Sequence, residues 1–149
     1  MEIRRALPTD AAALTRIAHA AKRHWGYPEG WIALWKDALT VTPQALERQA
    51  VYCAVEGTEL LGFCAVAGGG PTRELEHLWV APEHMGAGIG RRLLRHTLDA
   101  IRGSGGATLR IASDPNAEGF YLKMGARRVG ETPSQPEGRA LPLLLLEVG

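Results

Sequence analysis

Residues 75–94 read LEHLWVAPEHMGAGIGRRLL and carry the clearest structural signal in the chain. An apolar strand is predicted up to Pro82, three glycines follow at alternate positions, and an amphipathic helix begins at once. Glycines at such a place let backbone N–H groups approach a ligand closely, and a helix N-terminus presents those groups to an anion. Arg91 and Arg92 add positive charge to the first turn. The stretch therefore predicts a site that cradles a pyrophosphate.

The composition is that of one ordinary globular domain covering residues 1–149. The chain is 46% hydrophobic and 22% charged, and its formal net charge is +1. This charge gives no overall attraction to nucleic acid or to an anionic membrane, so we expect neither as a partner. No apolar stretch reaches the roughly 20 residues that cross a bilayer, and the N-terminus does not resemble a signal peptide. We therefore expect a cytoplasmic protein, either a monomer or a homodimer.

The hydrophobic pattern predicts strands and helices in mixed order. Strands are expected at residues 3–6, 51–55, 60–67, 74–80, 108–112, 127–129 and 141–148, the last one apolar enough to be buried. Helices are expected at residues 8–22, 43–49, 89–101 and 114–125, and a further helix is expected to carry Trp31, Leu34, Trp35 and Leu39 on one side. Residues 132–138 are expected to form a polar loop.

These elements predict an α/β protein with a central mixed sheet and helices on both faces. A turn at Gly57 joins two strands antiparallel, so a purely parallel sheet fits poorly. Cys53 and Cys64 lie in these two strands, and we expect them to be buried free thiols.

Two nucleotide motifs do not fit the glycine run. A Walker A loop needs four residues between its glycines and then Gly-Lys before Ser or Thr, and the chain has no such string. A dinucleotide fingerprint needs Gly-x-Gly-x-x-Gly early in a strand–helix–strand unit, whereas Gly86, Gly88 and Gly90 have another spacing and come late. A plain turn without a ligand would not require three glycines, each with its entropic cost.

The glycine run and its flanking residues match the signature of one protein family. Met85-x-x-Gly88-x-Gly90, between a strand with its proline and the residues Arg-Arg-Leu-Leu, resembles the acyl-CoA-binding signature of the GNAT superfamily of N-acyltransferases. Residues 114–126, DPNAEGFYLKMGA, resemble the next motif of that superfamily, in which a helix carries a tyrosine shortly before a glycine. The resemblance runs from the first strand to the last. It implies a GNAT-like fold and an acetyl-CoA-dependent N-acetyltransferase without a metal.

The resemblance also implies which residues contact acetyl-CoA. They are Leu78, Trp79, Val80, Met85, Gly86, Ala87, Gly88, Ile89, Gly90, Arg91, Asn116 and Tyr121. Met85 departs from the Gln or Arg that is usual in the family, so its side chain cannot bind a phosphate. Backbone N–H groups from Gly86 to Arg91 would still form the cradle. The aromatic residue that usually follows the glycine of the second motif is replaced by Ala126.

Acyl transfer to an amine requires a group that takes the amine's proton, because an amine with a pKa of about 10.4 is almost fully protonated at neutral pH. In the superfamily, the strand before the glycine run often carries a glutamate that acts as this base, usually through water. Glu76 and Glu74 share a face of that strand by alternation, and Glu76 is the first choice. A solvated ion pair is the alternative for each. His77 points to the opposite face unless a bulge intervenes. The superfamily has such a bulge in this strand, where a free backbone N–H can polarise the thioester carbonyl. Leu78 to Val80 are the expected donors.

The second motif implies two further roles. Tyr121 is expected to be the general acid, a phenol with a pKa near 10 that gives its proton to the departing thiolate, whose conjugate acid has a pKa of about 8.5. Packing in the core beside Phe120 is the alternative. Asn116 is expected to hydrogen-bond the pantetheine arm, to cap its helix, or to do both.

The acceptor site is expected between the first two helices, where the superfamily builds its substrate wall. His24, Trp25 and Tyr27 lie there and could hold a cationic or aromatic amine, although aromatic residues in this region could equally be packing residues. Arg139 could pair with a substrate carboxylate from the other side. The main alternative to an enzyme is a non-catalytic acyl-CoA-binding sensor or interaction module.

Overall fold

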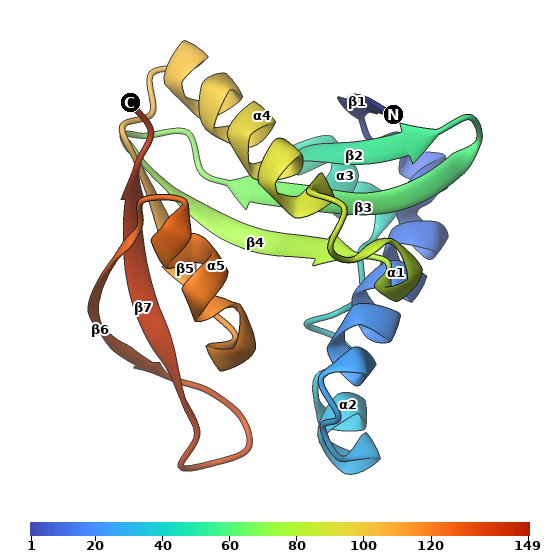
Figure 1. Ribbon diagram of the computed structural model, residues 1–149, viewed down its shortest axis with the longest axis vertical. Coiled ribbons are helices and arrows are strands. Elements are labelled where there is room, and N and C mark those ends of the chain that lie inside the picture. Colours follow the sequence, from blue (N-terminus) through green and yellow to red (C-terminus); the bar gives the residue numbers. More distant parts are fainter.

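A seven-stranded sheet runs through the computed structural model, which describes all of residues 1–149 (Figure 1). In spatial order its strands are β1 (Glu2–Arg5), β2 (Ala50–Glu56), β3 (Glu59–Ala67), β4 (Thr72–Val80), β5 (Thr108–Ala112), β7 (Ala140–Glu147) and β6 (Arg127–Pro133). Only β4 and β5 pair in parallel, and all other neighbours are antiparallel. The predicted mixed sheet is confirmed.

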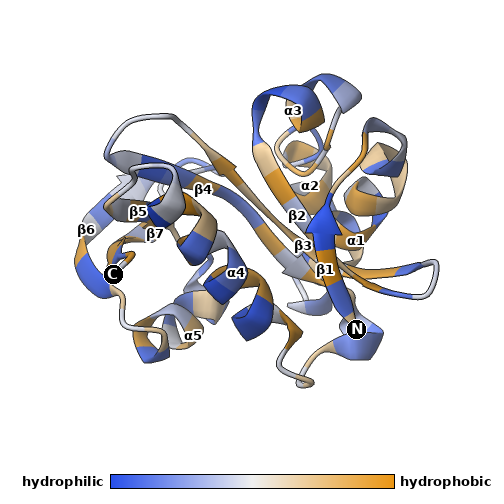
Figure 2. Cartoon of the chain, turned by 90° about the horizontal axis from the view of Figure 1, so that it is seen from above, coloured by the Kyte–Doolittle hydropathy of each residue, from blue (hydrophilic) through white to orange (hydrophobic).

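Helices cover both faces of the sheet, as predicted (Figure 2). One face carries α1 (Ala11–His24), α2 (Glu29–Leu34) and α3 (Pro43–Arg48), and the other carries α4 (Ile89–Gly103) and α5 (Glu118–Lys123). Short 3-10 helices lie at Pro8–Asp10, Pro82–His84 and Pro115–Ala117. Each face has its own core: Phe63 and Leu14 are fully buried on the α1 side, and Leu93 and Leu144 on the α4 side. No helix is long and apolar enough to cross a bilayer.

The sheet opens between β4 and β5. The two strands pair only from Thr72 to Glu74, opposite Thr108 to Arg110, and then diverge (Figure 1). On its other edge β4 stays paired with β3 as far as Val80, opposite Gly62. A Cβ on Gly62 would lie 2.7 Å from the carbonyl oxygen of Trp79, so only glycine allows this close approach. The diverging part of β4 therefore has one free edge, which forms a wall of the cleft described below.

A β-bulge places two neighbouring polar residues on one face of β4. Ala65 pairs with His77 and Val66 with Leu75, which leaves Glu76 as the extra residue. Leu75 and Leu78 both pack against the α4-side core, whereas Ala65, the partner of His77, belongs to the α1-side core. Glu76 and His77 therefore both face the α1 side. The bulge expected in this strand is therefore present, and the opposite-face position that a regular strand would give His77 does not apply.

Three expectations differ from the structure. The second helix is short: α2 ends at Leu34, whose side chain is 53% exposed, while Trp35 and Leu39 lie beyond it and are buried. Strand β6 extends to Pro133, because residues 130–133 pair with β7 instead of forming a loop. Strand β7 alternates between buried and half-buried residues, so only one of its faces lies in the core.

The two cysteines are free and buried, as expected. Cys53 faces the α1-side core and Cys64 the α4-side core, so the sheet separates them. Burial raises the pKa of Cys53 to about 11 and that of Cys64 to about 12, so neither thiol ionises readily.

Candidate active site

The glycine run forms a turn with free backbone donors. It lies between the 3-10 helix Pro82–His84 and the N-terminus of α4. The first helical bond runs from the N–H of Arg92 to the carbonyl of Gly88, at 3.1 Å, and none of the N–H groups from Gly86 to Arg91 donates a hydrogen bond to the protein backbone. All of these residues except Ala87 border a cavity of about 280 Å³. Such an arrangement binds an anion.

Two of the three glycines are required by the backbone. Gly86 has φ +85° and Gly88 has φ +81°, in the left-handed region where a side chain is strained. Gly90 has an ordinary backbone, and its Cα faces Phe120 and Val80, where a Cβ would make contacts at 3.7 Å. Gly90 therefore keeps the space between the turn and α5 open.

The turn continues into a larger cleft of about 320 Å³ between the diverging halves of the sheet. Both cavities are bordered by Val80, Met85, Gly90 and Phe120. The other residues around the cleft come from β4, from α1 and the turn after it, and from the segment between β5 and α5: Ala21, Trp25, Leu75, Glu76, His77, Leu78, Trp79, Ala112, Asp114, Asn116, Ala117 and Tyr121. One elongated, mostly apolar site thus leads from the anion-binding turn to a pocket with a few polar groups.

The two candidate glutamates have different surroundings. The carboxylate of Glu74 lies 3.2 Å from Nη1 of Arg110, on the last residue of β4 that still pairs with β5. Glu76 lines the cleft and has no ion pair or hydrogen bond with another side chain. Burial, and then the negative charge of Glu74, raise the pKa of Glu76 above its usual range. Of the two, only Glu76 borders the cleft, and only Glu74 has a charged partner.

His77 is a neutral group in the wall of the cleft. Its Nδ1 accepts a hydrogen bond from Nε1–H of Trp79, at 3.0 Å. An indole N–H only donates, so the ring proton of His77 must be on Nε2. Burial lowers the pKa of His77 to about 4, which keeps the ring uncharged at neutral pH.

The free edge of β4 presents backbone groups to the cleft. Ala81 N–H donates to Leu61 O at 2.8 Å, and Trp79 pairs with Phe63 two residues earlier. Because antiparallel bonds alternate along a strand, the backbone groups of Leu78 and Val80 point away from β3, into the cleft. Of the three residues expected to supply donors here, Trp79 instead directs its backbone to β3.

Tyr121 lies on the opposite wall. It is 6% exposed, packs edge-on against Phe120 at 5.2 Å between ring centres, and borders the cleft from α5. Its hydroxyl has no hydrogen-bond partner in the protein. Burial raises the pKa of Tyr121 above its usual range, and the negative charges that the Cys64 thiolate and the Asp114 carboxylate would place nearby raise it further. The phenol therefore remains protonated.

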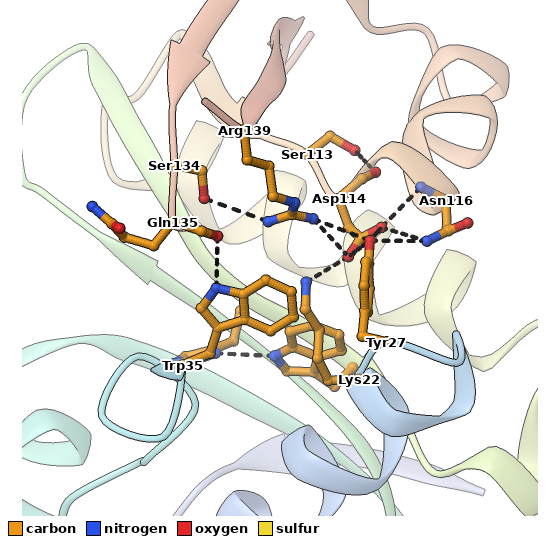
Figure 3. A network of polar contacts seen from close by, with 11 residues as sticks. Lys22, Tyr27, Trp35, Ser113, Asp114, Asn116, Ser134, Gln135 and Arg139 are labelled. Carbon is orange, nitrogen blue, oxygen red and sulfur yellow. Dashed lines mark hydrogen bonds and ion pairs between the residues drawn. The ribbon is translucent and has the colours of Figure 1, made fainter. Parts of the chain in front are cut away.

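A buried polar network closes one end of the cleft around Asp114 (Figure 3). The carboxylate accepts hydrogen bonds from Lys22 Nζ, from the Tyr27 hydroxyl at 3.1 Å and from both the backbone and side-chain nitrogens of Asn116. Arg139 donates to the Tyr27 hydroxyl at 3.0 Å. Burial acts to raise the pKa of Asp114, but its hydrogen bonds, that from Lys22 foremost, hold the pKa below its usual range.

Sequence reasoning missed Lys22 and Asp114. The signal for Lys22 was its place in α1, where a charged residue continues the buried stripe of Leu14, Ile17, Ala18 and Ala21. A lysine on such a stripe needs a buried acidic partner. That partner is Asp114, which is 92 residues away in the chain.

The four residues expected at the acceptor site take different positions. Trp25 is 41% exposed and borders the cleft, and the His24 ring lies beside it but does not border the cleft. Tyr27 and Arg139 belong to the network, where the Arg139 guanidinium also lies 4.7 Å from the centre of the Trp35 ring. Only Trp25 of these four lies directly on the cleft.

One group of side chains beside the turn has the composition of a metal-binding site. Glu59, Glu83 and His84 offer ligand atoms that lie within 4.8 Å of one another, outside the cleft. Two of the three are exposed acids, and His84 Nε2 lies 3.5 Å from Glu59. The contact between His84 and Glu59 accounts equally well for this group without an ion.

Comparison with known proteins gives one family. The sequence model of the acetyltransferase (GNAT) domain matches residues 47–125. N-alpha-acetyltransferase RimI of Mycobacterium tuberculosis is 38% identical over 82 residues, which are 52% of this chain and 51% of that protein. The chain thus matches about half the length of this curated relative.

Solved structures with the same fold cover nearly the whole chain. A GCN5-related N-acetyltransferase from Rhodopseudomonas palustris has a TM-score of 0.83 at 21% identity, covering 98% of this chain and 94% of that one. PaiA N-acetyltransferase from Thermoplasma acidophilum, in complex with coenzyme A, has a TM-score of 0.78 at 21% identity and covers 98% of each chain. The ribosomal-protein-S18-alanine N-acetyltransferase from Escherichia coli has a TM-score of 0.73 at 21% identity, covering 99% and 93%.

Proposed function

The chain belongs to the GNAT acetyltransferase family, and from this premise we propose that it transfers an acetyl group from acetyl-CoA to a primary amine of a small molecule or peptide. The observation that carries the proposal is the single elongated cleft, with free N–H donors at one end and, farther in, Glu76 and Tyr121 on opposite walls. The name of the M. tuberculosis relative makes the α-amine of a peptide the first acceptor to test.

In this proposal the turn from Gly86 to Arg91 binds the pyrophosphate of acetyl-CoA. Six backbone donors and the positive end of α4 would replace the hydration of the anion. Ala87 and Ile89 contribute through their backbone N–H groups, because neither has a side chain that binds phosphate, whereas the N–H of Met85 already donates to the carbonyl of Pro82 at 3.3 Å. Because the cleft continues from the turn between β4 and α5, the pantetheine arm would lie along it and bring the thioester to Leu78 and Val80.

Glu76 is proposed to be the base, directly or through one water molecule. The acceptor amine must be neutral before its nitrogen attacks the thioester carbon, and a carboxylate with a raised pKa is better suited to remove the proton than an ordinary glutamate. Glu74 would act on it indirectly, through its charge. The backbone N–H groups of Leu78 and Val80 supply donors for the oxygen that becomes negative as the nitrogen–carbon bond forms.

Tyr121 is proposed to be the acid. When the carbon–sulfur bond breaks, the thiolate of CoA takes the phenolic proton, and the tyrosine is reprotonated before the next cycle. Burial raises the pKa of Tyr121, so the phenol is fully protonated when the thiolate forms. Because the leaving thiol has a pKa of only about 8.5, the transfer itself is uphill, and reprotonation of the tyrosine from solvent draws it forward. The free hydroxyl and its position on the wall opposite β4 support this role.

Thiol release with a set of amines, together with calorimetry of CoA binding, tests the proposal. Wild-type protein is expected to bind acetyl-CoA and to release CoA only when an amine is present. Tyr121→Phe is expected to lower kcat by about a hundredfold or more while leaving CoA affinity unchanged. Tyr52→Phe, on β2 beside His96 and away from the cleft, is the matched control and should change neither.

Met85 favours one alternative, a protein that binds acyl-CoA without catalysis. It stands where the family usually has Gln or Arg, and it borders both the turn and the cleft. The same assay separates the two functions. Tight binding without thiol release for any amine would support the sensor, and no binding at high micromolar acetyl-CoA would refute both.

A further inference from the structure

The side-chain amide of Asn116 is held in one orientation. Its Nδ2 donates to Oδ1 of Asp114 at 2.9 Å and to the hydroxyl of Tyr27 at 3.1 Å. A carboxylate only accepts hydrogen bonds, so the atom that faces Asp114 must be the nitrogen. Both amide protons are then used, and the oxygen Oδ1 is left free on a residue that borders the cleft.

The hydroxyl of Tyr27 has no capacity for another partner. It donates to Asp114 and accepts from Asn116 Nδ2 at 3.1 Å and from Arg139 Nη2 at 3.0 Å. One proton and two lone pairs are thereby all used. Tyr27 thus belongs to the framework of the site and is not available to contact a substrate through its hydroxyl.

Arg139 extends this framework to the other side of the cleft (Figure 3). It lies at the end of the loop between β6 and β7, and its guanidinium lies 5.2 Å from the centre of the Tyr27 ring. In the same loop the carbonyl of Gln135 accepts a hydrogen bond from Trp35 Nε1 at 2.9 Å. A chain of contacts therefore runs from this loop through Tyr27 to Asn116.

We propose that Tyr27, and Arg139 through it, are positioning residues that orient the amide of Asn116 toward the pantetheine arm. This inference rests on the proposed function. The arm carries amide N–H groups, which need an oxygen to accept from them, and the free Oδ1 of Asn116 supplies one. If the amide of Asn116 rotated by half a turn, its N–H groups would face the N–H groups of the arm, and no hydrogen bond could form. The affinity for CoA is in this way partly set by residues that do not border the cleft.

We call this chain of contacts from Arg139 through Tyr27 to Asn116 the relay. Calorimetry of CoA binding to single and double variants tests it. Tyr27→Phe keeps the aromatic packing against Trp31 and Trp35 but removes the hydroxyl, and it is expected to weaken CoA binding about fivefold, the effect of one hydrogen bond. Arg139→Met is expected to weaken it by a smaller factor. Asn116→Ala should weaken it about as much as Tyr27→Phe, and adding Tyr27→Phe to Asn116→Ala should have no further effect.

Adenosine 3′,5′-bisphosphate serves as the control ligand because it lacks the pantetheine arm. Its affinity is expected to be the same for wild-type protein and Tyr27→Phe. An unchanged CoA affinity in Tyr27→Phe, an additive double variant, or equal weakening of both ligands would each overturn the relay, the last by showing a general structural defect. Failure of the wild-type protein to bind CoA at all would instead refute the proposed function, and the relay with it.

Discussion

Nη1 of Arg110 lies 3.2 Å from Oε2 of Glu74, and this ion pair is on the last register position that β4 and β5 share. Beyond it the strands diverge and the cleft begins. The carboxylate of Glu74 is therefore paired with Arg110 at the point where the two strands diverge. Glu76, the extra residue of the bulge, faces the cleft without such a partner, and this difference is the reason to propose Glu76 and not Glu74 as the base.

Glu76→Gln tests that decision. Glutamine keeps the shape of the side chain but cannot accept the proton of the amine, so kcat is expected to fall by about 100- to 1,000-fold with little change in CoA affinity. Steady-state thiol release at saturating acetyl-CoA measures kcat. Glu47→Gln, on the exposed surface of α3, is the control and should retain full activity. A kcat within a factor of two or three of wild type would show that another group or water alone accepts the proton.

The pH dependence of the rate should report the charge of Glu74. Burial, and then Glu74, raise the pKa of Glu76, so activity is expected to rise with pH as Glu76 loses its proton, at a higher pH than for an ordinary glutamate. Glu74→Gln removes the neighbouring negative charge and leaves Arg110 unpaired. Both changes lower the pKa of Glu76, so the acidic limb of the kcat profile should move to lower pH. If the acidic limb of the kcat profile does not move in Glu74→Gln, a group other than Glu76 controls it.

The fold and the anion-binding turn could be predicted because their signals are local. Strand and helix periodicity identified the elements of the mixed sheet, and the spacing of Gly86, Gly88 and Gly90 identified the turn that follows β4. The position of the bulge could not be predicted. It is set by how Ala65 and Val66 align with β4 across the sheet, and no single strand contains that information.

The polar network at the end of the cleft could not be predicted from the sequence either. Tyr27 and Arg139 were expected to meet a substrate, but their hydrogen-bonding groups meet each other. They are 112 residues apart in the chain, and Asp114, which organises both, resembled an ordinary residue at the start of a helix. Such a network forms only when three distant segments fold together.

Substitutions at two glycines, Gly88 just before α4 and Gly103 in its last turn, should separate backbone strain from helix preference. Gly88→Ala forces an alanine to φ +81° at the start of the helix and is expected to lower the free energy of unfolding by about 1 to 2 kcal/mol, with weaker CoA binding. Gly103→Ala, in the last turn of the same helix, has open space and no positive φ, so it should raise stability by up to about 1 kcal/mol. Urea denaturation measures both. Equal effects of the two changes would contradict the strained turn.

Lys22→Met tests whether the buried network contributes stability through charge. Methionine fits among the rings of Tyr27, Trp35 and Trp79 that surround the ammonium, but it leaves the Asp114 carboxylate without its cation. The free energy of unfolding is expected to fall by about 3 kcal/mol at neutral pH, whereas Lys36→Met, an exposed change, should have little effect.

The sign of the pH dependence follows from Asp114. Burial acts to raise the pKa of this carboxyl, but the hydrogen bond from Lys22 helps to hold it below its usual range. The pair therefore stabilises the fold fully above the unfolded-state pKa of about 3.9. This stabilisation is lost as the pH falls through the lower pKa of the folded state. The difference between wild type and Lys22→Met should therefore shrink when urea denaturation is repeated at acidic pH. A difference that is the same at both pH values would assign the loss to packing instead of charge.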